Sequence, residues 1–418
     1  MKFLFTTQPG FGHLLPLIPL AQALEKMGHE VLVACAASFL PRVAHAGLDG
    51  RAAGLDWLES KPEIAFPKAE GLTTSEREIF FAEIFVDITA NHMAYDLLTI
   101  CQEWQPNVIV RDAFEYGGCI VGEKLNIPYA AVDMELYIPA HITRDGMEGP
   151  LAYLRSAFDL PAYPAMEMLT RNLYLSYIPP SYQFPEYQLP DTAHALRPAF
   201  LDAKGDEMLP PWLATLPNRP TIYTTMGTSF NNVPEIMRLI IAALRDESVN
   251  VIITVGPGQD PQQYAPIPDN IHIEQFIPQS ALMPYCDLVI ANGGVGTSMI
   301  ALSHGCPLLL IPLGGHLQLH ALRCRALGIG LSLKLPPGMF DVNLESFDEE
   351  DDTFVTRQAK AMVYDDAPEL SADSLCQAVY TLLHDPTYRQ AAKQVQAEIL
   401  AMAGPQAGAA LLTQLAER

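Results

Sequence analysis

The chain has 418 residues, of which 25 are Lys or Arg and 48 are Asp or Glu, so its formal net charge is −23. A surface this acidic repels nucleic acid and anionic membranes at long range, which disfavours both as partners and leaves small molecules as the expected ligands. At ordinary domain sizes the length predicts two large domains or three small ones, each able to bury a core.

The first ten residues contain one basic residue and an apolar stretch that stops at a Thr-Thr-Gln-Pro-Gly turn. This stretch is too short for a signal peptide, and no apolar run approaches the ~20 residues that span a bilayer. We therefore expect a soluble, cytoplasmic protein without membrane insertion. The seven cysteines are scattered and form no Cys-x-x-Cys pair, which predicts reduced, buried thiols instead of disulfides or a zinc site.

The first 200 residues alternate between short apolar runs and segments with helical periodicity, which is typical of a parallel α/β sheet. One long helix is expected where apolar residues recur every three or four positions over residues 79–104. The expected strands are 2–7, 31–35, 108–110 and 129–132, and the other expected helices are 14–24 and 117–125.

A second α/β half follows a proline-rich stretch, residues 204–220, which predicts an exposed linker. Seven acidic residues among the twelve of 341–352 predict a solvated loop more than a metal site. Strands are expected at 221–225, 251–255, 271–273, 288–290 and 308–311. The expected layout is an N-terminal domain over 1–203, the linker over 204–220, a C-terminal domain over 221–390 and a closing helix over 391–418 that packs back toward the N-terminal domain.

Two glycine-rich turns lie at strand-to-helix junctions, Gly10-Phe11-Gly12-His13 and Asn292-Gly293-Gly294-Val295-Gly296-Thr297. Neither completes G-x-G-x-x-G, which disfavours a nicotinamide or flavin enzyme. In the second turn, glycines let backbone amides approach a ligand, and the helix that begins near Thr297 directs its positive end there. This predicts a phosphate or diphosphate site; the alternative is a tight turn without a ligand.

His13 and Asp112 each lie at the C-terminal edge of an expected strand, where open α/β sheets place their sites. A neutral imidazole near a helix start can accept a proton, and Asp112 can accept a hydrogen bond from the other ring nitrogen. The pair is therefore a candidate general base with its orienting carboxylate. A single His is more often structural, so the prediction depends on the two residues lying together.

Three blocks of sequence resemble the family 1 glycosyltransferases of bacterial natural-product pathways: FLFTTQPGFGHLLPLIPLAQALEKMGHEV, RPTIYTTMGTSF and IHIEQFIPQSALMPYCDLVIANGGVGTSMIALSHGCPLLLIPL. The tail HDPTYRQAAKQVQAEILAMAG is similar to that family's closing helix. The resemblance implies a GT-B fold, in which two Rossmann-like, doubly wound parallel-sheet domains face each other across a cleft. It also implies an inverting transfer of a sugar from a nucleoside diphosphate to a small acceptor.

The resemblance assigns roles to individual residues. It makes His13 the general base and Asp112 its partner, and it places the nucleotide base on Phe276. The co-substrate is a nucleotide sugar, and no metal or other cofactor is implied. The residues implied in donor binding are Gly227, Thr228, Phe276, Ile277, Gln279, Asn292, Gly293, Gly294, Gly296, Thr297, His316 and Leu317.

The chain departs from the family pattern in two places. Asn292 stands where a His usually precedes Gly-Gly, and its amide can still donate a hydrogen bond. His316 and Leu317 stand where the family has an Asp-Gln pair for sugar hydroxyls, although Gln318 could serve after a one-residue shift. Loss of a polar pair relaxes selection for a hydroxylated sugar, so the hypothesis is a deoxysugar on TDP in preference to UDP-glucose.

Aromatic and Met residues of the first half suit a broad, largely apolar aglycone, with core packing as the alternative for each. The expected acceptor contacts are Phe81, Phe85, Met134 and Tyr137. Two other functions stay open: a catalytically silent relative that binds a sugar nucleotide or partner enzyme, and a lipid-linked cell-wall glycosyltransferase, which the acidic composition disfavours. The identity of the aglycone, the atom that is glycosylated and a homodimeric state are also left open.

Overall fold

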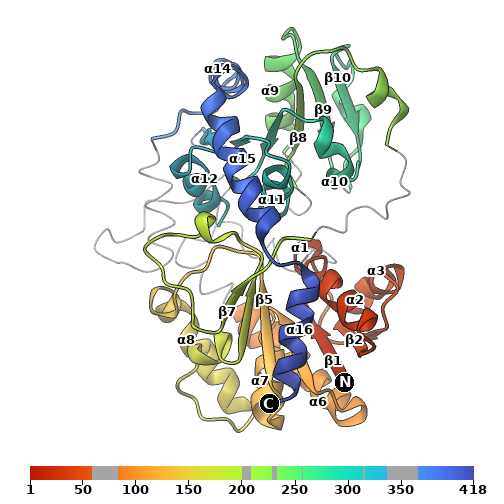
Figure 1. Ribbon diagram of the computed structural model, residues 1–418, viewed down its shortest axis with the longest axis vertical. Helices are drawn as coiled ribbons and strands as arrows, with labels where there is room; N and C mark the ends of the chain where they lie inside the picture. Colours follow the sequence, from red (N-terminus) through yellow and green to blue (C-terminus); the bar gives the residue numbers. More distant parts are fainter. Residues whose placement is uncertain (59–82, 200–208, 228–232, 257, 314–315, 337–365) are drawn as a thin grey trace. The chain divides into compact units, whose positions relative to one another are not determined.

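The computed structural model describes residues 1–58, 83–199, 209–227, 233–256, 258–313, 316–336 and 366–418 (Figure 1). These residues form two compact units. The first unit contains residues 1–199 and 402–418, and the second unit contains residues 209–336 and 366–401. Each unit is built around its own parallel sheet, which confirms the predicted doubly wound α/β class.

The first unit has a seven-stranded parallel sheet in the order β3-β2-β1-β4-β5-β6-β7. The chain winds outward from β1 in one direction and from β4 in the other, so the winding direction reverses between these two neighbours. In open α/β sheets this reversal point is where ligands bind. The strands are β1 Lys2–Thr6, β2 Glu30–Cys35, β3 Gly50–Ala52, β4 Val108–Asp112, β5 Tyr129–Asp133, β6 Leu173–Ser176 and β7 Ala193–Ala195.

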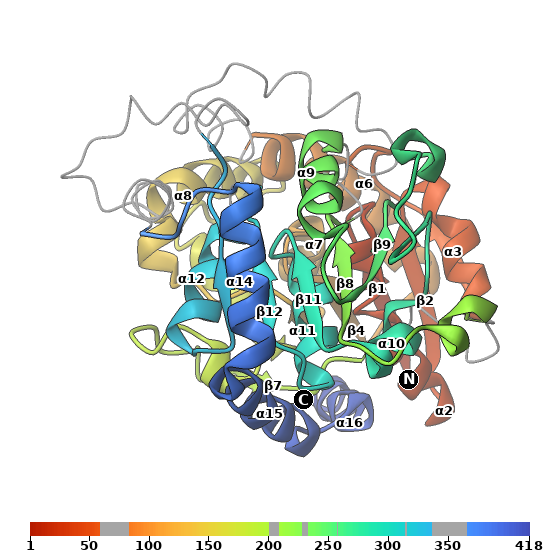
Figure 2. The same cartoon turned by 90° about the horizontal axis from the view of Figure 1, so that it is seen from above.

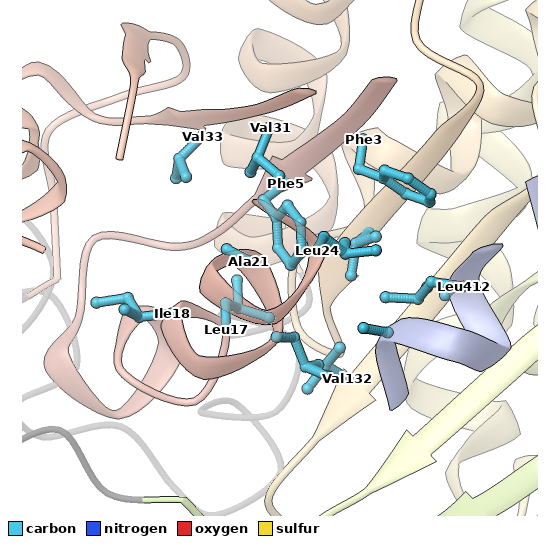
Figure 3. Packing of buried hydrophobic residues seen from close by; sticks show 14 of the residues in the cluster. Phe3, Phe5, Leu17, Ile18, Ala21, Leu24, Val31, Val33, Val132 and Leu412 are labelled. Atoms are coloured by element: carbon cyan, nitrogen blue, oxygen red, sulfur yellow. The ribbon is translucent and has the colours of Figure 1, made fainter. Parts of the chain in front are cut away.

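Helices cover both faces of this sheet, because successive strand side chains point to opposite faces. Phe3 and Phe5 belong to a core with Leu24 and Leu412 (Figure 3), whereas Leu4 belongs to a separate core on the other face. The helices are α1 Phe11–Leu14, α2 Ile18–Lys26, α3 Leu40–His45, α6 Asn91–Trp104, α7 Gly117–Leu125, α8 Ala140–Ala157 and α16 Pro405–Ala416, with a π-helix η2 Glu83–Ala90 and 3₁₀ turns η1 Ala37–Phe39, η3 Met166–Thr170 and η4 Pro180–Tyr182.

The second unit repeats the plan with six parallel strands in the order β10-β9-β8-β11-β12-β13, so its reversal point lies between β8 and β11. Figure 2 shows α14 beside α9, against which it packs. The strands are β8 Thr221–Thr225, β9 Asn250–Thr254, β10 Ile271–Glu274, β11 Leu288–Ala291, β12 Leu308–Leu310 and β13 Gly330–Ser332. The helices are α9 Pro234–Leu244, α10 Gln279–Leu282, α11 Val295–Ser303, α12 Leu317–Ala326, α14 Ala372–His384 and α15 Pro386–Ala401, with 3₁₀ turns η5 Pro211–Thr215, η6 Pro261–Tyr264 and η7 Met283–Tyr285.

The expected strands are present, but three helical segments differ from the expectation. The helix expected over 14–24 is divided into α1 and α2, since Pro16 has no amide to continue the first turn. In the long helix expected over 79–104, the described part opens as η2, where the Thr89 hydroxyl donates to the Phe85 carbonyl at 3.0 Å. The segment expected as one closing helix over 391–418 forms α15, in the second unit, and α16, in the first.

The described part of the expected linker, residues 209–220, lies on the second unit. Trp212 stacks on His272 of β10 with ring centroids 4.0 Å apart, and its Nε1 donates to the Glu274 carboxylate at 3.1 Å. This contact lies against the outer edge strand of the sheet. Leu213 is buried, while most of the other residues of the segment stay exposed.

The cysteines are thiols, as predicted: none of the seven is in a disulfide, and all except the half-buried Cys376 are buried. Within the described ranges, no three His, Cys, Asp or Glu side chains gather as a metal ion requires. The acidic run 341–352 lies outside those ranges. No single helix among the described residues is long and apolar enough to cross a membrane; α15 and α16 meet the length and composition test only when taken together across a 44° bend.

Candidate active site

His13 and Asp112 meet at the reversal point of the first sheet. Strand β4 pairs with β1 and ends at Asp112, level with Val132 of β5, which places the carboxylate on the face of the sheet that packs against α2. Burial of Leu14 in the same core anchors the short helix α1. The result is a contact of 2.8 Å between Asp112 Oδ2 and His13 Nδ1.

The carboxylate of Asp112 is held from two further directions. The Phe114 amide donates to Oδ1 at 3.2 Å, and the Gln8 amide approaches Oδ2 at 3.5 Å. Asp112 is buried, while the His13 side chain keeps about a quarter of its surface exposed. A carboxylate at Nδ1 fixes the imidazole tautomer that has its proton on Nδ1, so Nε2 is the nitrogen that can accept a proton.

A row of aromatic rings leads away from His13 in the first unit. Phe114 meets the imidazole edge-to-face at 5.8 Å, Phe85 lies 6.4 Å from Phe114, and the buried Trp57 meets Phe85 edge-to-face at 4.7 Å. Phe85, Phe114 and His13 are each half-buried, so part of every ring faces outward. Such rings present flat apolar area next to the base.

The other predicted acceptor contacts have different surroundings. Met134 packs against the core that contains Leu14, and Tyr137 meets the buried Tyr174 edge-to-face at 5.7 Å. Phe81 lies outside the described residues. Among the predicted acceptor residues that the structure describes, Phe85 is the one connected to His13 by ring contacts, and the connection runs through Phe114.

In the second unit, Asn292 joins the two loops that follow β8 and β11. Its Nδ2 donates to the Met226 carbonyl at 2.9 Å, and its Oδ1 accepts from the Gly294 amide at 3.0 Å. Gly227 has a φ of +82°, which strains a residue with a side chain, and a Cβ there would also lie 3.1 Å from this Nδ2, so the position favours glycine. Asn292 thus holds the glycine turn in shape, and the Gly294 amide is already engaged.

The glycine turn leads directly into the N-terminus of helix α11, where the next backbone amides lie together. Helix α11 begins at Val295, and its first intrahelical bond runs from the Ser298 amide to the Gly294 carbonyl. No side chain among the described residues caps this end. The amides of Val295, Gly296 and Thr297 therefore have the orientation and the helix dipole that suit an anion.

The remaining predicted donor residues differ in exposure. Phe276 is 61% exposed, so its ring face is accessible, whereas Ile277 is buried in the protein interior. Gln279 is half-buried at the start of α10. Thr228 lies outside the described residues.

His316 and Leu317 stand at the start of α12. His316 is the exposed N-cap residue, and Leu317 is buried in the core of the second unit. A side chain on Gly293, whose φ is +92°, would place its Cβ 3.0 Å from the Leu317 carbonyl oxygen. Gln318 is buried as well. Position 317 therefore offers an apolar side chain that faces the core.

Two family models match the chain. The model described as Erythromycin biosynthesis protein CIII-like, N-terminal domain, matches residues 22–227, and the corresponding C-terminal domain model matches residues 238–345. Together they span well over half of the chain. The chain belongs to the EryCIII-like glycosyltransferase family.

Individual relatives of this EryCIII-like glycosyltransferase agree with the family assignment. The 4'-demethylrebeccamycin synthase of Lentzea aerocolonigenes is 29% identical over 372 residues, which are 80% of this chain and 87% of that protein. The crystal structure of the glycosyltransferase SnogD from Streptomyces nogalater is 26% identical, with a TM-score of 0.69 over 100% of this chain and 99% of SnogD. The structure of the glycosyltransferase VinC in complex with dTDP has a TM-score of 0.76 at 24% identity and covers 100% of both chains. The fold is GT-B, and the enzyme takes its sugar from a nucleotide donor.

Sequence reasoning missed the groups that support the segment carrying Asp112. The Arg111 guanidinium is fully buried and donates to the carbonyls of Asp112, Ala113, Glu115 and Leu169. The available signal was a charged residue, Arg111, directly after the apolar run Val108–Val110 of an expected strand. An Arg that is buried there needs many hydrogen-bond acceptors around it.

Glu115 supports the same segment from the other side. Its carboxylate is 0% exposed and accepts from the Thr6 hydroxyl at 2.6 Å and from the amides of Gly117 and Gly118 at 2.5 and 2.9 Å. Burial raises the pKa of this carboxyl, while the hydrogen bonds oppose that rise. A Cβ on Gly117 would lie 2.8 Å from Glu115 Oε1, so the Glu-Tyr-Gly-Gly sequence is the local signal for this helix cap.

Proposed function

We propose that this glycosyltransferase inverts the configuration of the sugar's anomeric carbon and that His13 is the general base. The single observation that carries the proposal is the 2.8 Å contact between His13 Nδ1 and Asp112 Oδ2. It directs Nε2 to the acceptor. As the acceptor oxygen attacks the anomeric carbon, its proton passes to Nε2, and the Asp112 carboxylate stabilises the imidazolium that forms.

The second unit receives the leaving nucleoside diphosphate. The bond between the anomeric carbon and the diphosphate oxygen breaks, and negative charge grows on that oxygen. The first amides of α11 and the helix dipole stabilise such a charge without a metal ion, since they are fixed in place before the reaction. Exposure of Phe276 supports its role as the surface on which the nucleotide base stacks.

The proposed acceptor is a small, largely apolar natural product. The half-buried rings of Phe114, which contacts His13, and of Phe85, which contacts Phe114, support this choice, because they offer flat apolar area close to the base. Met134, Tyr137 and Phe81, which lies outside the described residues, complete the proposed acceptor set.

The proposed donor is a deoxysugar on thymidine diphosphate. The replacement of the family's Asp-Gln pair by His316 and Leu317 supports it, because Leu317 faces the core and position 317 therefore presents no polar group to a sugar hydroxyl. The fold similarity to VinC, which was solved with dTDP, is consistent with a thymidine nucleotide.

One experiment tests both the proposed donor and the proposed inversion of configuration. The enzyme is incubated with TDP-deoxysugar or UDP-glucose and a panel of aromatic and macrocyclic aglycones, and products are detected by mass spectrometry. We expect at least a tenfold higher kcat/KM with the TDP-deoxysugar, and an anomeric configuration opposite to that of the donor by NMR coupling constants. Preference for UDP-glucose contradicts the donor assignment, and a retained configuration contradicts inversion.

A further inference from the structure

Gln8 follows β1 and is buried, with 3% of its surface exposed, yet the mechanism above assigns it no role. Both ends of its side-chain amide are engaged. Oε1 accepts from Trp57 Nε1 at 3.0 Å, and Nε2 donates to the Phe114 carbonyl at 3.1 Å and to Thr89 Oγ1 at 3.4 Å. One side chain therefore joins the segment of Trp57, the π-helix η2 and the turn after β4.

The three partners of Gln8 belong to, or contact, the row of aromatic rings that begins at His13. Phe114 carries the ring that meets the imidazole, and Trp57 packs against Phe85, the next ring in the row. Thr89 lies four residues after Phe85 in η2 and bonds its carbonyl. π-Helices are rare and are frequently found at functional sites. Through these contacts Gln8 holds Phe114, Phe85 and Trp57 in place relative to one another.

Burial makes this network sensitive to change. Trp57 and Thr89 are buried together with Gln8. Removal of the Gln8 amide would take one hydrogen bond from the buried indole N–H of Trp57 and one from the partly buried Phe114 carbonyl, and loss of a buried hydrogen bond is costly. The rings would then shift to recover hydrogen bonds.

We propose that Gln8 is a positioning residue that sets the aromatic row at the correct distance from His13, so that a bound acceptor presents its hydroxyl to Nε2. The inference rests on the proposed role of His13 as the base. Gln8 acts through Phe114, Phe85 and Trp57, and a shift of about 1 Å in acceptor position is enough to reduce the rate strongly.

Hydrolysis of the donor distinguishes a positioning role from a merely structural one. If Gln8 only supported the fold, its loss would reduce sugar transfer and donor hydrolysis together. In hydrolysis, water attacks the anomeric carbon, its proton goes to the base, and the nucleoside diphosphate leaves with the electrons of the broken bond. Water needs no aromatic row to position it. Loss of Gln8 positioning should therefore reduce transfer to the aglycone and spare hydrolysis of the nucleotide sugar.

The test compares Gln8→Met, which keeps the length and removes the hydrogen bonds, with Gln22→Met as the matched control. Gln22 lies in α2 and donates to the Ala46 carbonyl at 2.9 Å, outside the site. We expect Gln8→Met to lower kcat/KM for the acceptor at least tenfold while donor hydrolysis stays within threefold of wild type. Gln22→Met should leave both rates within twofold.

A second variant keeps the test decisive if Gln8→Met folds poorly. Trp57→Phe removes one hydrogen bond to Gln8 and keeps an aromatic ring against Phe85, and we expect a smaller loss of transfer, about threefold. If both single variants fold, the double variant should lose less than the product of the two single effects, because both remove the same bond.

Three results would overturn the inference: wild-type transfer in Gln8→Met, equal loss of transfer and hydrolysis in Gln8→Met, or wild-type transfer in Trp57→Phe. The proposed function is judged separately by His13→Ala. If His13→Ala is inactive and Gln8→Met transfers normally, only the role of Gln8 is refuted; if His13→Ala remains active, the base assignment itself is wrong.

Discussion

Asp112 is the residue on which the orientation of His13 depends. One of its oxygens contacts Nδ1, and backbone amides of Phe114 and Gln8 direct both oxygens. Arg111 and Glu115 hold the main chain of the same segment in place. The sequence predicted that His13 and Asp112 lie together, because each stands at the end of an expected strand. It did not predict the supporting roles of Arg111 and Glu115, because their hydrogen bonds depend on loop geometry that no local sequence pattern specifies.

Asp112→Asn should reduce kcat by a factor on the order of 10² to 10⁴, because an amide can donate to Nδ1 and so favour the wrong tautomer. The KM for the nucleotide sugar should change little, since the proposed donor residues lie in the second unit. Steady-state kinetics with varied donor and acceptor measures both. A kcat within threefold of wild type would show that the carboxylate does not orient the base.

Asp133 at the end of β5 gives a prediction about stability and pH. Burial raises the pKa of its carboxyl to about 6, although the Tyr174 hydroxyl and the Glu135 amide donate to it. In the unfolded chain an Asp titrates near pH 4. Between these values the folded protein holds a proton that the unfolded chain has released, so this group's stabilising contribution is lost as the pH rises from about 4 to about 6.

Asp133→Asn removes this titration. The free energy of unfolding of the variant relative to wild type should therefore increase by about 2 kcal/mol between pH 4.5 and pH 7. Urea unfolding at both pH values measures the difference and cancels the contribution of the other carboxyls. Parallel pH dependences for the two proteins would show that Asp133 does not titrate in this range.

At the scale of elements, strands were predicted well and helix ends poorly. Strands such as Val108–Asp112 are buried on both faces, so their apolar runs are unambiguous. Short edge strands such as Ala193–Ala195 carry little apolar signal. The break between α15 and α16 falls at Gly404-Pro405, a local signal that the expectation of one closing helix did not use. The apolar spacing over 79–104 does not distinguish the π-helix η2 from the α-helix α6 that follows it.

Helix α16 stabilises the first unit by packing on α2, and Leu412 is its fully buried contact (Figure 3). Leu412→Ala should lower the free energy of unfolding by about 2 to 5 kcal/mol, because it leaves a cavity in a close-packed core. The matched control is Leu400→Ala in α15, where the side chain is 57% exposed and the expected cost is about 0.5 kcal/mol. Thermal and urea unfolding compare the two variants, and equal effects would contradict the packing role of α16.

At the scale of the whole molecule, the two units divide the proposed chemistry. Each places its candidate residues at the reversal point of a parallel sheet. His13 follows β1 and Asp112 ends β4, while Gly227 follows β8 and Asn292 follows β11. The sequence predicted this duplication because both glycine turns follow apolar strands. It did not predict that Asn292 binds the protein's own loops, since the sequence alone does not reveal the Met226 carbonyl and the Gly294 amide as its partners.

The rate of sugar transfer by His13→Ala tests the central claim most directly, with nucleotide binding measured on the same protein by calorimetry. We expect transfer to fall by a factor of about 10² to 10⁴, the usual contribution of a general base, while the affinity for thymidine diphosphate stays within twofold of wild type. Transfer at the wild-type rate by a correctly folded His13→Ala enzyme would contradict the account.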